Sequence, residues 1–371
     1  MKKWIIRTAA AFVATVLFLC NAYAAPATSA QCAILMDADT GRVLLAQNIE
    51  CRCLIASTTK IMTAVVVLEH CSPDTAYTIP AQATNIEGSS IYLKAGEKLT
   101  IRDLLYGMML HSGNDAAIAL ALACSDSVPE FVDLMNLKAQ KLGLQNTHFD
   151  NPNGLDAENH YSTAADLANL TRYALQNEEF VKIVSTKSIT IGERYLTNHN
   201  KLLWSVEGAI GVKTGYTKAA GRILVSAAER NGRRLIAVTI NDGNDWHDHA
   251  ALYDYGFSQY KLKKVAARGE LAGSVSGLDG REYPVCFAED INFPMLEGER
   301  TKMRMLFPKM TFGACAPGES AGIAIITLGG KTIAHTRVLW AEREAPYGGT
   351  ITENTFRTRG SFQTAGGGYD F

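Results

Sequence analysis

The sequence STTKIMTAVVVLEH runs from Ser57 to His70 and contains neither Gly nor Pro. Its Met, Ala, Val and Leu residues predict a mostly buried helix that begins at or near Ser57. Residues three apart share one face of a helix, so the Ser57 hydroxyl and the Lys60 amine are expected within hydrogen-bond reach. The stretch therefore predicts a core helix that carries a candidate nucleophile and its base.

This Ser-x-x-Lys spacing is weak evidence by itself. Serine becomes a strong nucleophile when a neighbour takes its proton, and a lysine can do so where a dry, cation-rich site lowers its pKa. The more common alternative is structural, with Ser57 as a helix N-cap and Lys60 as a solvated charge.

A second motif, Ser112-Gly113-Asn114, lies between helices predicted at 104–110 and 114–124. Side chains in such a loop can project into a cleft. Because Ser and Asn favour caps and Gly favours turns, a plain capping turn is the alternative interpretation.

The third motif, Lys213-Thr214-Gly215, follows Ile210-Gly211-Val212 at a predicted strand edge. Lys213 supplies positive charge, the Thr214 hydroxyl can hold a carboxylate, and Gly215 lets a substrate approach the backbone closely. Taken alone, the motif is equally compatible with a polar strand end.

Length and composition predict two folded units. The chain has 371 residues, more than the roughly 100–200 of one domain. Its 47% hydrophobic and 20% charged residues exclude a disordered chain and a polytopic membrane protein. Because 36 basic residues face 37 acidic ones, the charge lacks the basic footprint of a nucleic-acid binder, and no nucleic-acid partner is expected.

The N-terminal residues 1–24 are predicted to be a secretory signal peptide. Basic residues precede an apolar run over 9–20 and a small-x-small site at 22–24, and the run is too short to span a bilayer of about 30 Å. A lipoprotein signal through Cys20 is the weaker alternative, because bulky Leu19 stands where such signals carry a small residue. We expect cleavage after Ala24 and export to the periplasm or cell-wall space.

Residues 25–260 are predicted to form an α+β domain and residues 261–345 a small β-rich domain. The first is expected to contain a hairpin over 33–45, helices from Thr163 and over 245–257, and a strand pair over 222–228 and 234–240. The last segment, 346–371, reads as a flexible Gly-rich tail. It lacks the apolar stripe of an amphipathic helix, which argues against membrane anchoring.

Seven cysteines follow residue 24, so at least one thiol stays free or pairs between chains. No regular framework is visible, and we expect small buried hydrophobes rather than disulfides that carry the fold. Cys51-x-Cys53 lacks a second Cys pair or a nearby His at zinc spacing, so no metal is expected.

Together and in this order, the three motifs match the set of penicillin-binding proteins and β-lactamases. The first domain resembles the D-alanyl-D-alanine carboxypeptidases, the low-molecular-mass penicillin-binding proteins, and Gly113 in place of Asp favours them over class A β-lactamases. The resemblance implies a transpeptidase-type fold, an antiparallel sheet packed with helices. It rests on 35–37, 40–41, 56–64, 103–107, 112–116, 151–155, 160–164 and 211–217.

The resemblance implies a serine mechanism on the D-Ala-D-Ala end of a peptidoglycan stem peptide. Ser57 would attack the carbonyl, Lys60 would take its proton, and Ser112 would relay a proton to the leaving amine. Water would then hydrolyse the acyl-enzyme. No cofactor or metal is needed, and β-lactam antibiotics would acylate Ser57 as inhibitors.

Substrate binding is implied in the same way. Asn114 would hold the substrate amide and the Lys60 side chain, and Lys213 with Thr214 would bind the terminal carboxylate. The backbone N–H groups of Ser57 and Tyr216 would form the oxyanion hole.

Two residues depart from the family pattern, and several functions stay open. Ile55 and His111 stand where proline is usual, and His111 is assigned no role. The alternatives are a D,D-endopeptidase or β-lactamase of the same fold, or a penicillin-binding wall module with little turnover. The intact proton-transfer residues Lys60, Ser112 and Asn114 argue against the last.

Overall fold

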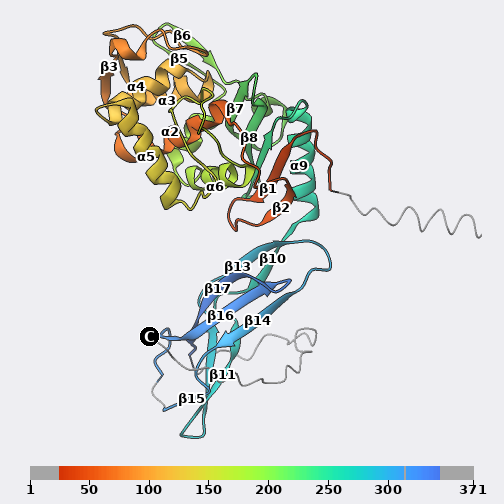
Figure 1. Cartoon of the computed structure of the whole chain (residues 1–371). Coiled ribbons are helices and arrows are strands. Elements are labelled where there is room, and N and C mark those ends of the chain that lie inside the picture. The colour runs from red at the N-terminus through yellow and green to blue at the C-terminus, as the bar shows by residue number, and fades with distance from the viewer. Residues whose placement is uncertain (1–24, 313–314, 343–371) are drawn as a thin grey trace, which may run out of the picture. The chain divides into compact units, whose positions relative to one another are not determined.

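A computed structural model (Figure 1) describes residues 25–312 and 315–342. The predicted signal peptide and Gly-rich tail lie outside the described residues. The chain divides into two units, one with residues up to Lys263 together with Asn292–Glu299, the other with Lys264–Ile291 and the residues from Arg300 onward. The return of 292–299 to the first unit is a feature that the composition change after Tyr260 did not predict.

The first unit is built on an antiparallel five-stranded sheet of order β2-β1-β9-β8-β7. The predicted hairpin is confirmed, and so is the strand pair around the turn at Asn231 and Gly232, both of which have positive φ. The strands are β1 (Cys32–Asp37), β2 (Val43–Gln47), β7 (Ala209–Thr217), β8 (Gly221–Arg230) and β9 (Arg233–Ile240).

Helices cover both faces of this sheet (Figure 1). Successive side chains of a strand point to opposite faces of the sheet. Ile34 and Met36 of β1 therefore belong to the core that includes residues of α2 to α7. Leu35 packs on the other face with Leu252 and Tyr253 of α9. The helices are α2 (Lys60–His70), α3 (Ile101–Leu110), α4 (Asn114–Cys124), α5 (Val128–Lys141), α6 (Ala164–Ala174), α7 (Glu178–Ser185), α8 (Leu202–Ser205) and α9 (Asp245–Gln259).

The predicted core helix is confirmed, with one local difference. Residues Ala56–Thr59 form a 3₁₀ turn, η1, and the α-helix α2 begins only at Lys60. All residues from Lys60 to Val67 are buried. Over these residues the helix is therefore buried on every side, as expected for an element enclosed by other helices and the sheet.

One cysteine pair overturns the expectation of isolated small hydrophobes. Cys71 and Cys124 form a disulfide that joins the C-terminal ends of α2 and α4. The two residues are 53 positions apart, and no spacing motif links them. Their pairing follows from the packing of α2 beside α4.

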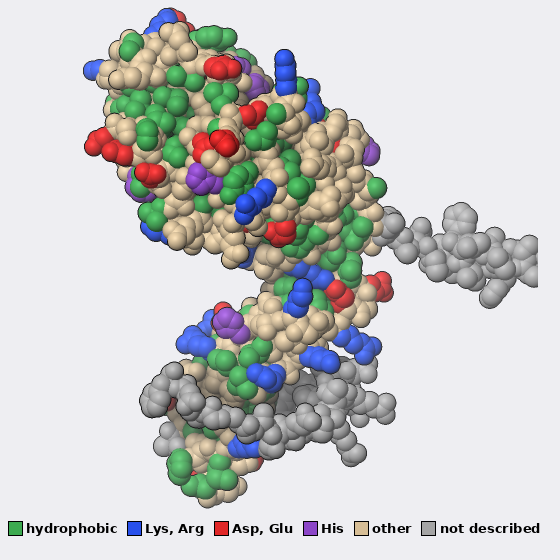
Figure 2. Space-filling view, viewed as in Figure 1, with side chains coloured by type: hydrophobic (Ala, Val, Ile, Leu, Met, Phe, Trp, Pro, Cys, Tyr) green, Lys and Arg blue, Asp and Glu red, His purple; other side chains and the backbone are tan. Residues whose placement is uncertain are grey.

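Short elements complete the first unit. β3 (Ala76–Thr78) pairs with β4 (Lys98–Thr100), and β5 (Ser188–Ile191) pairs with β6 (Arg194–Thr197). A second 3₁₀ turn, η2, spans Ala81–Ala83. On the face shown in Figure 2, basic and acidic side chains are interspersed over this unit.

The second unit is a six-stranded sheet of order β14-β16-β17-β12-β11-β15, antiparallel except between β11 and β15. Its core includes Val285, Ile326 and Val338. The fold class, α+β with a β-rich C-terminal domain, is thus as predicted. In the part of the chain that the structure describes, no helix has the length and apolar character needed to cross a membrane. The strands of the six-stranded sheet are β11 (Leu271–Gly277), β12 (Glu282–Phe287), β14 (Thr301–Leu306), β15 (Met310–Thr311), β16 (Ser320–Leu328) and β17 (Lys331–Trp340). A separate two-stranded sheet pairs β10 (Lys261–Ala266) with β13 (Ile291–Met295).

Candidate functional site

The structure brings Ser57 and Lys60 together at the junction of η1 and α2. Lys60 Nζ lies 2.9 Å from Ser57 Oγ, 2.7 Å from Asn114 Oδ1 and 2.5 Å from the Asn153 carbonyl oxygen. Lys60 is completely buried, whereas Ser57 is half-buried. The candidate nucleophile is therefore open to solvent, and its candidate base is not.

The surroundings of Lys60 favour its neutral form. Burial lowers its pKa well below the ordinary value, the positive charge of Lys213 lowers it further, and Asp115 opposes these effects. A neutral amine has two N–H donors and one lone pair. The amide oxygen of Asn114 and the Asn153 carbonyl accept the two donors, which leaves the lone pair for the Ser57 O–H.

Two glycines hold the backbone beside Ser57. A Cβ on Gly154, whose φ is +85°, would lie 2.0 Å from the Ala56 carbonyl oxygen and 3.0 Å from Ser57 N. A Cβ on Gly215 would lie 3.2 Å from the Ile55 carbonyl oxygen and 3.3 Å from Ser57 N. The close approach at Gly215 is therefore to the segment before the nucleophile, where sequence reasoning expected substrate.

A chain of buried hydrogen bonds through His160 and Thr59 stabilises the η1 turn. The Asp150 N–H donates to His160 Nδ1 at 3.0 Å, so Nε2 carries the proton and faces Thr59 Oγ1 at 2.7 Å. The Thr59 hydroxyl then donates to the Ala56 carbonyl at 2.8 Å. Burial lowers the pKa of His160 to about 4, so the ring is neutral at neutral pH.

The Ser112-Gly113-Asn114 motif lies between α3 and α4, as predicted. Ser112 is buried with φ of +63°, and its hydroxyl makes no hydrogen bond to the described residues. Asn114 orients its amide by donating from Nδ2 to the Glu87 carbonyl at 2.7 Å, which turns Oδ1 toward Lys60. The structure thus joins Asn114 to Ser57 and Lys60 but gives the Ser112 hydroxyl no direct link to them.

Asp115 organises the loop opposite this motif. Its buried carboxylate accepts from Ser90 Oγ at 2.6 Å and from the backbone N–H groups of Ile91 and Leu93 at 3.0–3.1 Å. The carboxylate therefore stabilises the loop that also supplies the Glu87 acceptor for Asn114.

The Lys213-Thr214-Gly215 motif lies within β7, the edge strand of the sheet. Lys213 is buried and its Nζ donates to the Thr214 carbonyl at 3.0 Å. Burial lowers the pKa of Lys213 to about 7. Thr214 is half-buried, and the Tyr216 side chain is 66% exposed, so any role of Tyr216 beside Ser57 falls to its backbone.

Sequence reasoning assigned no role to Asn153, Gly154, His160 or Asp115. Their signal was indirect, since all four fall within strings that resemble the carboxypeptidases. His111 stays without an assigned role. Its ring lies 4.7 Å from that of His199, and its Nδ1 is buried without a hydrogen-bond partner in the described structure.

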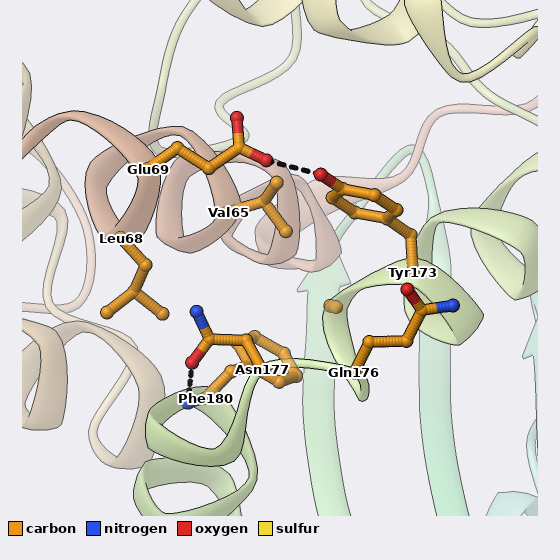
Figure 3. Close-up of a pocket in the computed structure, with 8 residues that line it drawn as sticks. Val65, Leu68, Glu69, Tyr173, Gln176, Asn177 and Phe180 are labelled. Atoms are coloured by element: carbon orange, nitrogen blue, oxygen red, sulfur yellow. Dashed lines mark hydrogen bonds between the residues drawn. The ribbon is translucent and has the colours of Figure 1, made fainter.

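A separate cavity of about 240 Å³ lies near the other end of α2 (Figure 3). Glu69 accepts from the Tyr173 hydroxyl at 2.7 Å across it, and Asn177 caps α7 through the Phe180 N–H. None of the predicted site residues lines this cavity. It is therefore distinct from the Ser57 site.

The chain is similar to known proteins over most of its length. The family described as D-alanyl-D-alanine carboxypeptidase matches residues 20–244. D-alanyl-D-alanine carboxypeptidase DacF of Bacillus subtilis is 33% identical over 345 residues, which cover 88% of each chain. D-alanyl-D-alanine carboxypeptidase DacD of Escherichia coli is 36% identical over 65% of this chain and 66% of its own.

Solved structures agree with these sequence relatives. Penicillin binding protein 5 from Haemophilus influenzae has a TM-score of 0.72 and 30% identity, and covers 85% of this chain and 97% of its own. The carboxypeptidase DacD from Francisella tularensis has a TM-score of 0.68 and 28% identity, with coverages of 86% and 94%. The resemblance first seen in the motifs is confirmed, and the chain belongs to the D-alanyl-D-alanine carboxypeptidase family of serine hydrolases.

Proposed function

We propose that this chain removes the terminal D-alanine from peptides that end in D-Ala-D-Ala, through an acyl-enzyme on Ser57. One observation carries the assignment of the site. Lys60 Nζ is buried 2.9 Å from Ser57 Oγ, and two neutral oxygens occupy its other hydrogen-bonding positions. This is the geometry of a serine activated by a neutral amine.

In the acylation step, Ser57 Oγ attacks the carbonyl carbon between the two D-alanines while its proton moves to Lys60. The oxyanion accepts hydrogen bonds from the backbone N–H groups of Ser57 and Tyr216; one such donor is typically worth about 3–4 kcal/mol. Lys60 then returns this proton to the leaving amine, with the Ser112 hydroxyl as the relay. Water then releases the shortened peptide and restores Ser57.

Substrate orientation falls to the β7 motif and to Asn114. Lys213 and the Thr214 hydroxyl bind the terminal carboxylate, and Asn114 holds the substrate amide. The carboxylate favours the charged form of Lys213, whose pKa is about 7 before substrate binds. Gly215 contributes by letting β7 pack against the backbone at Ser57.

The substrate in the cell is a peptidoglycan stem pentapeptide, and β-lactam antibiotics acylate Ser57 in its place. Support comes from relatives named D-alanyl-D-alanine carboxypeptidase and from a similar structure named penicillin binding protein 5. Residues 1–24 direct export, and the enzyme acts outside the cytoplasmic membrane.

Mass spectrometry after penicillin treatment tests the nucleophile. We expect an adduct on the wild-type protein and none on Ser57→Ala, and an adduct on both would exclude Ser57. A Lys60→Ala variant is expected to acylate about 10²–10⁴-fold more slowly, the usual contribution of a general base.

Three substrates separate the remaining functions. A carboxypeptidase releases D-alanine from a pentapeptide faster than it cleaves a cross-linked dimer or hydrolyses penicillin. Faster cleavage of the dimer would indicate an endopeptidase, and faster turnover of penicillin a β-lactamase. A lasting adduct on a folded protein that cleaves neither peptide would indicate a binding module.

A further inference from the structure

Three cysteine thiols from two segments of the first unit, β1 and residues 51–53, lie close together. The Sγ atoms of Cys32, Cys51 and Cys53 all lie within 4.8 Å of one another. Cys32 Sγ is 3.8 Å from Cys53 Sγ, and Cys53 Sγ is 3.9 Å from Cys51 Sγ. The sequence predicted no metal because Cys51-x-Cys53 had no further ligand at zinc spacing. The fold supplies the third thiol from β1.

The two distances to Cys53 Sγ match those between thiolates on one metal ion. Sulfur atoms bound about 2.3 Å from a tetrahedral Zn²⁺ lie about 3.8 Å apart. Soft thiolate ligands select Zn²⁺ and Cu⁺ over hard cations such as Mg²⁺ and Ca²⁺. We propose that Cys32, Cys51 and Cys53 bind one soft metal ion, Zn²⁺ or Cu⁺, through three thiolates.

The three cysteines differ in burial, so the cluster is closed on one side and open to solvent on the other. Cys32 is fully buried, Cys53 is half-buried and Cys51 is exposed. An ion can therefore enter beside Cys51, and a water molecule can take a fourth position on that side. Three thiolates close together repel one another, and the cation supplies the opposing charge.

The backbone already holds the two inner sulfurs in place. Cys32 lies in β1 and pairs in register with Ile240 of β9. The Cys53 N–H donates to the Ser162 carbonyl at 2.9 Å, and the Ser162 N–H donates back to Cys53 at 3.1 Å. Metal binding thus requires little rearrangement of the main chain, which reduces its entropic cost.

The site lies close in sequence and space to the candidate nucleophile. Cys53 precedes Ser57 by four residues, and its bridge partner Ser162 follows His160, which contacts η1 through Thr59. A metal ion would fasten the 51–53 segment to β1 just before this turn. The expected consequence is greater stability of the first unit, whichever reaction Ser57 performs.

Metal analysis of the purified full chain tests the proposal. The protein is reduced in the absence of air with a reductant that leaves the Cys71–Cys124 disulfide intact, then dialysed against ZnCl₂ or a Cu⁺ complex in separate arms. We expect one bound ion per chain in at least one arm. Cys51→Ser should weaken affinity at least about 10-fold, and because Cys51 is exposed, this change spares the core.

Cys286→Ser provides the matched control, since Cys286 is a half-buried free cysteine in β12 of the second unit. It should bind the ion like the wild type. At a metal concentration about 100 times Kd, the wild type and this control should unfold about 5–10 °C higher than without metal, and Cys51→Ser should gain much less.

Two results would overturn the proposal. One is a wild-type protein that holds no more Zn²⁺ or Cu⁺ than Cys51→Ser does. The other is a disulfide between two of the three cysteines, found by peptide mapping of protein isolated from its own compartment without reductant.

Discussion

Replacing Gly154 by alanine should slow acylation at Ser57 without changing any functional side chain of the site. The new Cβ would lie 2.0 Å from the Ala56 carbonyl oxygen, whereas real Cβ contacts stay above 3.0 Å. One of the two backbones must therefore move by about 1 Å. Ala56 already has φ of +44° and directly precedes Ser57, so the displacement falls on the nucleophile.

The magnitude follows from this displacement. Misplacing a reacting group by about 1 Å can reduce a rate about 10²-fold, which corresponds to about 2.7 kcal/mol in the activation free energy. Separately, alanine at φ of +85° carries about 1–2 kcal/mol of left-handed backbone strain, which lowers stability.

Gly143→Ala separates these two effects. Gly143 has φ of +70° and no heavy atom within 4 Å of the position of an added Cβ. Gly143→Ala should unfold roughly 2–8 °C lower than the wild type. Gly154→Ala should unfold lower still, because it must also relieve the clash with Ala56, and both variants should remain folded. Only Gly154→Ala should lose about 10²-fold in the rate of penicillin acylation, measured by stopped-flow or quenched mass spectrometry. If the two variants acylate within about 3-fold of each other, Gly154 does not position Ser57.

Three further predictions follow from charges and cross-links. With a substrate that carries a free carboxylate, kcat/KM should fall as pH rises past about 7, because Lys213 has a pKa of about 7 and loses its charge there. In Lys213→Arg, this fall in kcat/KM should move to higher pH. His160 is neutral when folded, with a pKa of about 4, but titrates near 6.5 when unfolded, so the unfolded state binds more protons between these values. Stability should therefore decline by about 3 kcal/mol as pH falls from 6.5 to 4, and urea midpoints of His160→Gln should decline less steeply. Replacing both Cys71 and Cys124 by serine should lower the free energy of unfolding by about 4 kcal/mol, as chain entropy gives for a 53-residue separation, and the urea midpoint should fall accordingly.

The elements that sequence predicted well are those whose signal is local. The helix over 114–124 was predicted with the bounds that the structure has, and the hairpin around Asn231 and Gly232 follows from turn residues that accept positive φ. Helix α2 starts three residues later than predicted because residues Ala56–Thr59 form a 3₁₀ turn, and such turns are frequent at the N-termini of α-helices. Periodicity and turn chemistry suffice where neighbours in sequence are neighbours in space.

Long-range partners left no comparable signal. The Asn153 carbonyl reaches Lys60 across 93 positions, and any residue could supply a carbonyl there. Because Gly215 has no side chain, either substrate or protein could approach it closely. The packing of β7 against η1 places the Ile55–Ser57 backbone there. The cluster around Cys53 likewise depends on β1, which brings in a thiol 21 positions away. Motif reasoning found the side chains, whereas the fold determines what holds them.

The state of Lys60 depends on keeping carboxylates away from it. A buried carboxylate, Asp115, lies next to Asn114 in the chain, and an ion pair with Lys60 would keep the proton on the amine. The Asp115 oxygens are instead occupied by Ser90 Oγ and by backbone N–H groups. Among the described residues, Lys60 contacts only neutral oxygens, and the nearby charge that most affects its pKa is the ammonium of Lys213. Because the Asp115 carboxylate is held by Ser90 and the backbone N–H groups of this loop, it does not pair with Lys60, and the lysine stays able to accept the Ser57 proton.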